Sequence, residues 1–285
     1  MGREQPTRFM CGVGDVNSTI ACAMVAKKLG IPVAHVEAGL RSFDNEMPEE
    51  INRVLTDSIS DLFFVTEPSG VFNLAREGKP FESIHLVGNV MIDTLLRMKH
   101  KAEEKKFYQT LNVKPKEYAV VTLHRPSNVD KRGVLQEIIK QIIWLSNKMP
   151  VIFVMHPRTK KNLQTFGLME SLKNLSSLRL SQSLPYLDSL SLIMNAAVVV
   201  TDSGGLQEET SVLGVPCLTI RKNTERPITI TEGTNTLIGT DWKLFQDCIH
   251  RINKGDYLKN VAQIPYWDGK AGGRILNVLN KYAWK

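Results

Sequence analysis

The sequence predicts an α/β protein built from doubly wound parallel sheets. Short apolar runs of strand length alternate with amphipathic helical patterns along the 285 residues, which is typical of successive βαβ units. The apolar runs read as strands that are buried on both faces, so helices are expected on both sides of each sheet. A charged segment at 99–116 interrupts the alternation. We therefore expect two domains, at residues 1–112 and 113–285.

The first domain is expected to contain four strands joined by helices. The strands are predicted at 9–13, 32–37, 62–66 and 83–87. The helix between the first two has Asp15 or Asn17 as its predicted N-cap and Gly30 as its predicted C-terminal stop. A second helix is expected to begin with Pro48 at its first position. Because a doubly wound half usually has about five or six strands, the first domain is predicted to be incomplete.

The second domain is expected to continue the same alternation. Its strands are predicted at 118–123, 151–155, 178–180, 197–201 and 216–220, with a helix after most of them. A closing helix is predicted at about 273–282. This last helix is expected to pack back on the first domain, as closing helices often do in α/β proteins of two domains.

Composition narrows the class of partner. A net charge of +7 and a pI near 9.2 favour an anionic partner. No platform of aromatic and basic residues accompanies the charge, so a small anionic molecule is expected and nucleic acid is not. The apolar runs are far shorter than the ~18 residues of a membrane span, so no membrane partner is expected. The four scattered cysteines predict reduced, buried thiols in a cytoplasmic protein.

Polar side chains follow most of the predicted strands. In open α/β sheets ligands bind at the carboxyl ends of the strands, so these residues are candidates for a site. No histidine spacing typical of a metal site is present, and no metal is expected. The candidates gathered in this way are Asp15, Glu37, His124, Arg125, His156, Arg158, Ser203, Gly204, Gly205, Glu209 and Arg226.

The stretch "TDSGGLQEE" at 201–209 is the most interpretable of these strand ends. Its two glycines let backbone N–H groups approach a ligand, and the N-terminus of the following helix favours a phosphate. Glu208 and Glu209 lie one turn further on, where they could accept hydrogen bonds from ribose hydroxyls. The alternative is an ordinary turn between strand and helix, whose acidic residues complement the helix dipole.

The stretch "HVEAGLRSFDNEMPEE" at 35–50 holds three notable carboxylates. Glu37 ends a buried strand and must find a partner or a ligand, because burying a lone carboxylate is costly. Glu49 and Glu50 fall in the first turn of a helix, where the alternative reading is dipole complementarity. Dipole complementarity requires only one of these two glutamates. Arg53, one turn on, could pair with either.

Two histidines and one arginine have competing interpretations. His124 and His156 each stand at a strand end and are followed closely by an arginine. Such histidines act as caps or core residues when they occur singly, but two in the same setting favour a site. Arg226 precedes a proline, so its backbone is extended and its guanidinium could project toward a ligand. The alternative for Arg226 is an exposed loop residue.

Taken together and in order, seven motifs resemble those of the non-hydrolysing UDP-N-acetylglucosamine 2-epimerases. The motifs are "GD", "HVEAGLRS", "MPEEINRVLTD", "LHRPSN", "HPR", "TDSGGLQEE" and "TERP", spread from about residue 9 to the closing helix. The resemblance implies two Rossmann-like domains in a glycosyltransferase-B arrangement, the second of which binds UDP. It also implies interconversion of UDP-GlcNAc and UDP-ManNAc through 2-acetamidoglucal, with no nicotinamide or metal and with UDP-GlcNAc as an allosteric activator.

The resemblance assigns roles to individual residues. The family's catalytic positions are matched by Asp15, Glu37, Glu49 and His124. Positions that bind UDP or the substrate are matched by Arg41, Arg125, His156, Ser203, Gly204, Gly205, Glu209 and Arg226. Family members begin with a further strand and a G-T-R-P-E motif, and this sequence starts beyond that region, so part of the first domain is expected to be missing. A homodimer is expected. The alternatives are a catalytically impaired fragment that binds UDP-sugars and a glycosyltransferase of the same fold.

Overall fold

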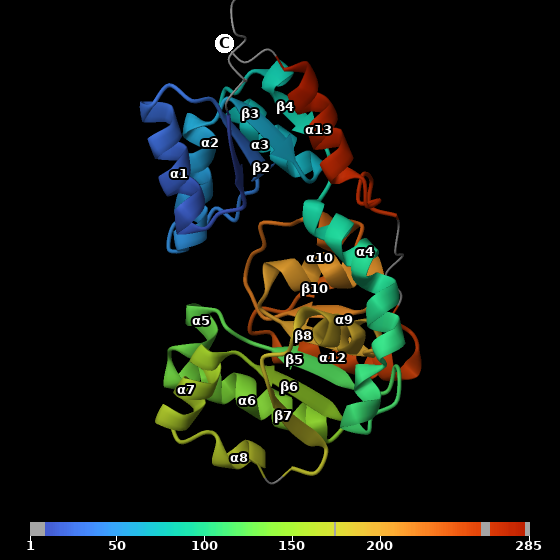
Figure 1. Ribbon diagram of the computed structural model, residues 1–285. Coiled ribbons are helices and arrows are strands. Elements are labelled where there is room, and N and C mark those ends of the chain that lie inside the picture. The colour runs from blue at the N-terminus through green and yellow to red at the C-terminus, as the bar shows by residue number, and fades with distance from the viewer. Residues whose placement is uncertain (1–8, 174, 258–262, 283–285) are drawn as a thin grey trace, which may run out of the picture. The chain divides into compact units, whose positions relative to one another are not determined.

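A computed structural model describes residues 9–173, 175–257 and 263–282 (Figure 1). It confirms the α/β class, with one parallel sheet of four strands and another of six. Contacts group the described residues into two units. Unit 1 comprises those within Met1–Thr94, Thr224–Ile228 and Ile264–Lys285, and unit 2 comprises those within Leu95–Asn223 and Thr229–Gln263. The chain passes from unit 1 to unit 2 inside helix α4 (Val90–Lys105), whereas the predicted boundary followed residue 112. Only the first part of the charged segment is α-helical, since α4 continues to Lys105.

Unit 1 contains the four-stranded sheet, with all neighbouring strands parallel. Its order is β1 (Met10–Val13), β2 (Val33–Ala38), β3 (Leu62–Val65) and β4 (Ile84–Leu86). The connecting helices are α1 (Asn17–Lys28), α2 (Pro48–Ile59), α3 (Pro68–Arg76) and the single 3-10 turn η1 (Phe81–Ser83). The four predicted strands are thus confirmed. Because the strands are parallel, their carboxyl ends meet at one edge of the sheet.

Helix α13 (Ala271–Lys281), from the far end of the chain, completes unit 1 (Figure 1). Its Ile275 packs in one apolar cluster with Val36, Phe64 and other residues of the sheet. The backbone N–H groups of Ala271 and Gly272 donate to the Asp93 carboxylate, at 3.0 and 2.7 Å. This carboxylate satisfies two N–H groups that the first turn of a helix leaves without partners. Apolar burial therefore holds α13 on the sheet, and the Asp93 carboxylate joins its first turn to α4.

The start of α1 differs from the prediction. Val16 is the N-cap residue, and none of the described side chains caps this helix. Neither Asp15 nor Asn17 acts as the cap, because the Asp15 carboxylate is bound to Arg53 of α2 instead. The end of α1 agrees with the prediction, since the helix stops at Lys28 and Gly30 follows in the left-handed conformation at φ 69°.

Unit 2 contains the six-stranded parallel sheet. Its order is β10 (Asn235–Leu237), β9 (Cys217–Thr219), β8 (Val198–Thr201), β5 (Ala119–Thr122), β6 (Val151–Met155) and β7 (Leu178–Gln182). The chain runs outward from β5 through β6 and β7, then returns to β8 and runs outward in the other direction. Strand β10 was not predicted, because its three residues are too few to show a pattern. The order reverses between β5 and β8, which is where open α/β sheets bind ligands.

Helices cover both faces of this sheet (Figure 1). They are α5 (Pro126–Val129), α6 (Arg132–Ser146), α7 (Pro157–Thr165), α8 (Glu170–Lys173), α9 (Tyr186–Met194), α10 (Gly204–Leu213), α11 (Ile228–Thr231) and α12 (Trp242–Lys254), with the 3-10 turn η2 (Phe107–Leu111). One buried apolar cluster joins α6 and α12 to one face, and a second joins α9 to the other. The central strands β5, β6, β8 and β9 are therefore mostly buried, as their apolar runs predicted, whereas the edge strands β7 and β10 are partly exposed.

The four cysteines differ in their burial. Cys217 and Cys248 are buried, but Cys11 and Cys22 are exposed, so the prediction of buried thiols was wrong for these two. They lie on edge strand β1 and on α1. Within the described residues, no helix is long and apolar enough to cross a membrane.

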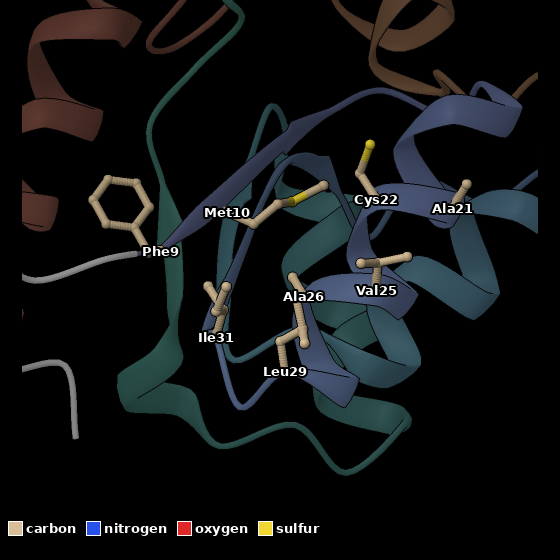
Figure 2. Close-up of a pocket in the computed structure, with 8 residues that line it drawn as sticks. All are labelled: Phe9, Met10, Ala21, Cys22, Val25, Ala26, Leu29 and Ile31. Carbon is tan, nitrogen blue, oxygen red and sulfur yellow. The ribbon is translucent and has the colours of Figure 1, made fainter.

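An apolar hollow of about 730 Å³ lies beside β1 (Figure 2). It is lined by Phe9, Met10, Ala21, Cys22, Val25, Ala26, Leu29 and Ile31. This lining offers no carboxylate, imidazole or guanidinium. The hollow is therefore unsuited to a sugar nucleotide, and the candidate site lies elsewhere.

Candidate functional site

In unit 1, the end of β1 is joined to helix α2 by ion pairs. The carboxylate of Asp15 accepts hydrogen bonds from Nε of Arg53, at 3.2 Å, and from its Nη2. Asn52 donates to the Asp15 carbonyl at 2.9 Å. Asp15 remains partly exposed, whereas the Arg53 side chain is almost fully buried. A buried arginine therefore holds a partly exposed carboxylate at the end of a strand.

Glu37 lies at the end of β2 in a backbone conformation that is rare for its type. Its φ is 69°, in the left-handed region that favours glycine. Burial raises the pKa of Glu37, and the Asp15 carboxylate raises it further. Arg226 and Arg53 act in the opposite direction. A Cβ placed on Gly14 would lie 3.7 Å from Oε2 of Glu37, so the Glu37 carboxylate lies beside the turn that carries Asp15.

Glu49 and Glu50 begin α2 and have different environments. Glu49 is partly exposed at the second position of the helix. Glu50 is 2% exposed, and its carboxylate accepts hydrogen bonds from the backbone N–H groups of Ser42 and Phe43, each at 2.9 Å. Arg53 donates to the same carboxylate at 2.6 Å. Glu50 therefore anchors the loop after β2, a role that goes beyond dipole complementarity.

The turn that follows Glu37 packs directly on α3. Gly39 has φ 80°, and a Cβ placed there would lie 2.4 Å from the Gly70 carbonyl oxygen. Asn73 of α3 donates to the Gly39 carbonyl at 2.9 Å. Only glycine combines this conformation with so close a contact. The residue type at the end of "EAG" is therefore dictated by packing.

Replacing Gly39 with alanine is expected to lower the free energy of unfolding by about 2–5 kcal/mol. A left-handed alanine costs about 1–2 kcal/mol, and a backbone clash adds about 1–3 kcal/mol. Gly30→Ala is the matched control, because Gly30 also has a positive φ but a Cβ placed there would have no described atom within 4 Å. Urea unfolding of both variants measures the difference. Equal losses for the two would show that the Gly70 contact does not matter.

Arg41, which the sequence predicted to bind the ligand, is 5% exposed and has internal partners. It forms a bidentate pair with Glu77, at 2.8 and 2.7 Å, and its Nη1 lies 2.7 Å from Asp57 Oδ2. Nη1 also donates to the Leu40 carbonyl at 2.7 Å. In this structure Arg41 fixes the loop after β2, and ligand binding by Arg41 stays a prediction.

In unit 2, His124 and Asp202 lie together where the strand order reverses. His124 follows β5, Asp202 follows β8, and Nδ1 of the histidine is 2.9 Å from Oδ1 of the carboxylate. Asp202 also accepts from the backbone N–H groups of His124 and Arg125 and from Nδ2 of Asn128, all near 3.0 Å. Hydrogen bonds from these groups hold the pKa of Asp202 below its usual range although burial opposes this. A fully buried carboxylate therefore orients a partly exposed imidazole.

His156 lies near this pair at the start of α7. Its ring centroid is 5.7 Å from that of His124. Its Nδ1 accepts a hydrogen bond from the backbone N–H of Arg158, at 3.2 Å, and so caps the helix. Burial lowers the pKa of His156, and the neighbouring His124 lowers it further. The structure thus brings together two of the predicted site residues, and His156 is both a cap and a neighbour of His124.

The Ser-Gly-Gly turn has the predicted form. Ser203 is the N-cap of α10, and Gly204 and Gly205 are its first residues. Glu209 is 7% exposed and accepts a hydrogen bond from the Tyr186 hydroxyl at 3.2 Å. Burial raises the pKa of Glu209 to about 6. The turn therefore places two glycines at a helix N-terminus, with a buried carboxylate further along the helix.

Arg226 belongs by its contacts to unit 1, within the segment Thr224–Ile228. It is 7% exposed and forms an ion pair with Glu225. It also lowers the pKa of Glu37 and opposes the effect of burial on Glu67, whose pKa is raised to about 7. Glu67 ends a buried strand, as Glu37 does, and is 1% exposed. The interpretation of Arg226 as an exposed loop residue was wrong, and its predicted role in UDP binding stays a prediction.

Sequence reasoning missed three groups that the structure places beside the candidates. They are Asp202, Arg53 as the partner of Asp15, and the buried pair of His35 and Asp57. Asp202 was recognisable in principle, since it stands directly after a buried strand inside the "TDSGG" motif. The other partners are far apart in sequence, and only packing brings them together.

A family model and the sequences of known proteins point to the same family. A family model described as UDP-N-acetylglucosamine 2-epimerase matches residues 2–280. The chain is 40% identical to the UDP-N-acetylglucosamine 2-epimerase of Methanococcus maripaludis over 97% of this chain and 76% of that protein. It is 35% identical to the UDP-2,3-diacetamido-2,3-dideoxy-D-glucuronate 2-epimerase of Pseudomonas aeruginosa over 98% of this chain and 76% of that protein.

Solved structures agree with these sequence matches. The structure resembles that of the Methanocaldococcus jannaschii UDP-GlcNAc 2-epimerase in complex with UDP-GlcNAc and UDP. The TM-score is 0.87 at 41% identity, over 98% of this chain and 77% of that one. It also resembles the Neisseria meningitidis UDP-GlcNAc 2-epimerase bound to UDP-GlcNAc, with a TM-score of 0.85 at 29% identity over 95% and 76% of the two chains.

Proposed function

This chain belongs to the UDP-N-acetylglucosamine 2-epimerase family, and we propose that it interconverts UDP-GlcNAc and UDP-ManNAc. Relatives and solved structures that bear this activity in their names support the proposal. The local observation that supports it most is the pair of strand-end carboxylates in unit 1, Asp15 and Glu37. One is held by a buried arginine, and the other is strained and has a raised pKa.

The reaction needs acid and base groups because C2 of the sugar has no adjacent carbonyl. Removing the C2 proton alone would leave a carbanion without resonance stabilisation. We propose that the C2–H electron pair forms the C1=C2 double bond while UDP leaves C1 with the electrons of the C1–O bond. A phosphate oxygen of UDP then adds back to C1, and C2 accepts a proton on the opposite face. The intermediate is 2-acetamidoglucal.

The carboxylates of unit 1 are assigned to the proton transfers. Glu37, Glu49 and Asp15 supply the acid or base for each face of C2 and a negative charge for the oxocarbenium-like transition state. The raised pKa of Glu37 suits a group that must both accept and return a proton near neutral pH. Glu49 stands at the second position of a helix and is partly exposed, so a ligand can reach it.

Unit 2 and the segment at 224–228 are assigned to the nucleotide. The N-terminus of α10, with Ser203, Gly204 and Gly205, suits a phosphate. His124, oriented by Asp202, suits a donor to the departing diphosphate. Arg226 supplies positive charge. Glu209 accepts hydrogen bonds from the ribose, while Arg125 and His156 are assigned to the nucleotide or to an activating UDP-GlcNAc.

Solvent exchange tests the proposed reaction. Incubating the protein with UDP-GlcNAc in deuterium oxide is expected to yield UDP-ManNAc and to place deuterium at C2 of both sugar nucleotides, because C2 is deprotonated and reprotonated. Mass spectrometry and proton NMR measure both. UDP-2,3-diacetamido-2,3-dideoxy-D-glucuronate is tested as a second substrate, because a relative is named for it.

If calorimetry detects UDP binding but neither sugar nucleotide exchanges its C2 hydrogen, the result would instead support a fragment that only binds UDP-sugars. Sugar transfer to an acceptor without exchange would support a glycosyltransferase.

The proposal also covers assembly and location. A homodimer remains our expectation, and sedimentation velocity would reveal a monomer if it is wrong. A cytoplasmic location rests on the sequence alone, through the scattered free cysteines. Neither point affects the exchange test, which needs only the purified protein.

A further inference from the structure

A fully buried histidine, His35 of β2, has hydrogen-bond partners on both ring nitrogens. Its Nδ1 lies 2.6 Å from Oδ1 of Asp57, and its Nε2 lies 3.1 Å from the Gly14 carbonyl oxygen. The side chains of His35 and Asp57 are both 0% exposed. A carbonyl oxygen can only accept a hydrogen bond, so Nε2 must carry a proton. The protonation state of the ring then depends on Asp57.

Asp57 is surrounded by donors, which favours its ionised form. Its Oδ2 accepts a hydrogen bond from the Gly39 N–H at 3.0 Å and lies 2.7 Å from Nη1 of Arg41. A carboxylate that accepts from a guanidinium and an amide has little tendency to hold a proton of its own. Nδ1 of His35 must therefore be the donor in its bond to Asp57. With protons on both nitrogens, His35 is an imidazolium.

The same contacts surround the proposed catalytic carboxylates. His35 is two residues before Glu37, and Gly39, which donates to Asp57, is two residues after it. Gly14, whose carbonyl binds His35, directly precedes Asp15. One buried carboxylate thus fixes the chain on both sides of Glu37, and through the imidazole it also fixes the turn that carries Asp15. This accounts for the strained φ of Glu37, which surrounding contacts must hold in place.

We propose that His35 is a permanently charged positioning residue, held by Asp57 and the Gly14 carbonyl, which fixes the carboxylates of Glu37 and Asp15 and favours the ionised form of Glu37. Its effect on catalysis rests on the proposed function, but its charge state does not. The charged or titratable groups that act on His35 are Asp57 on α2 and Glu37 on the same strand, and Arg41 in the following loop pairs with Asp57.

The titration behaviour of these groups agrees with the geometry. Burial is the largest effect on His35 and lowers its pKa, but the hydrogen bond to Asp57 and the charges of Asp57 and Glu37 outweigh it, so the net shift is upward. For Glu37, burial raises the pKa, and His35 is among the groups that oppose this rise. Removing the charge of His35 should therefore raise the pKa of Glu37 further.

The charge state can be measured without any activity. In protein labelled with nitrogen-15 histidine, long-range proton–nitrogen spectra distinguish an imidazolium from either neutral tautomer. One of the six histidines is expected to remain an imidazolium well above the ordinary histidine pKa of about 6.5, and its signals should be absent from His35→Gln. A neutral His35 at pH 7.5 would overturn the proposal.

The positioning effect is tested with kinetics of His35→Gln and Asp57→Asn. Both are expected to lower kcat about 10- to 100-fold with little change in KM, and His35→Gln is expected to move the acidic limb of the pH–rate profile to higher pH. His85→Gln is the matched control, because His85 is on β4, which β3 separates from β2, and it lies opposite Phe64 of β3 rather than beside Asp57. A folded His35→Gln variant with an unmoved acidic limb would refute the positioning role. If this variant does not fold, the kinetics of Asp57→Asn test the positioning role and the wild-type spectrum tests the charge state.

A wild-type protein without epimerase activity would contradict the proposed function, and its spectrum would still test the charge state of His35.

Discussion

Glu37→Gln is expected to lower kcat about 10²- to 10⁴-fold, the range typical of losing a general acid or base. Glutamine has nearly the same shape, so KM should change little. The wild-type rate should fall as pH drops through the raised pKa of Glu37, because the protonated carboxyl cannot accept the C2 proton. The variant should lack this acidic limb. Initial rates of UDP-ManNAc formation across the pH range measure both effects.

Glu46→Gln is the matched control for this prediction. Glu46 is an exposed carboxylate in the loop before α2, and its replacement should leave the rate and the pH profile unchanged. Glu49→Gln extends the comparison to the helix that follows. A Glu37→Gln variant that retains wild-type kcat and an acidic limb would remove Glu37 from the proton transfers and leave Asp15 and Glu49 as candidates.

Asp202→Asn is expected to have the second large effect, on both activity and stability. The carboxylate accepts from two backbone N–H groups, from Asn128 and from the His124 ring. Asparagine has one oxygen, so its NH₂ group must face one of these donors. We expect the free energy of unfolding to fall by about 1–3 kcal/mol, as for a buried group left unpaired. We also expect kcat to fall about 10²-fold or more, because His124 loses its orientation.

Asp130→Asn is the control, since it changes an aspartate of the same region to the same residue. Asp130 is exposed and pairs with Arg158, and exposed ion pairs contribute about 0–1 kcal/mol. Thermal unfolding and epimerase rates measured together separate the two effects. A stable Asp202→Asn variant with normal kcat would mean that His124 does not depend on Asp202 for its role.

The sequence alone supported part of the prediction for Glu37. Glu37 could be selected from the sequence because a carboxylate at the end of an apolar strand cannot be buried alone. Its strained φ, its neighbour Asp15 and its control by His35 could not be inferred in this way. The sequence offered Asp15 or Asn17 as a helix cap, besides giving Asp15 as a site candidate, because an aspartate before a helix is a common cap. An arginine of another helix, 38 residues further on, has taken that carboxylate.

The sequence by itself determined the fold class, four strands of unit 1, most strands of unit 2 and the family, because these depend on residue order and on periodicity over a few residues. It also located the strand ends that hold the candidate residues. Only the tertiary structure decided which groups meet. Asp202 reaches His124 across 78 residues, and Asp57 reaches His35 across 22. Hydrogen bonds and charge states depend on these distances in space, and local sequence patterns contain no information about them.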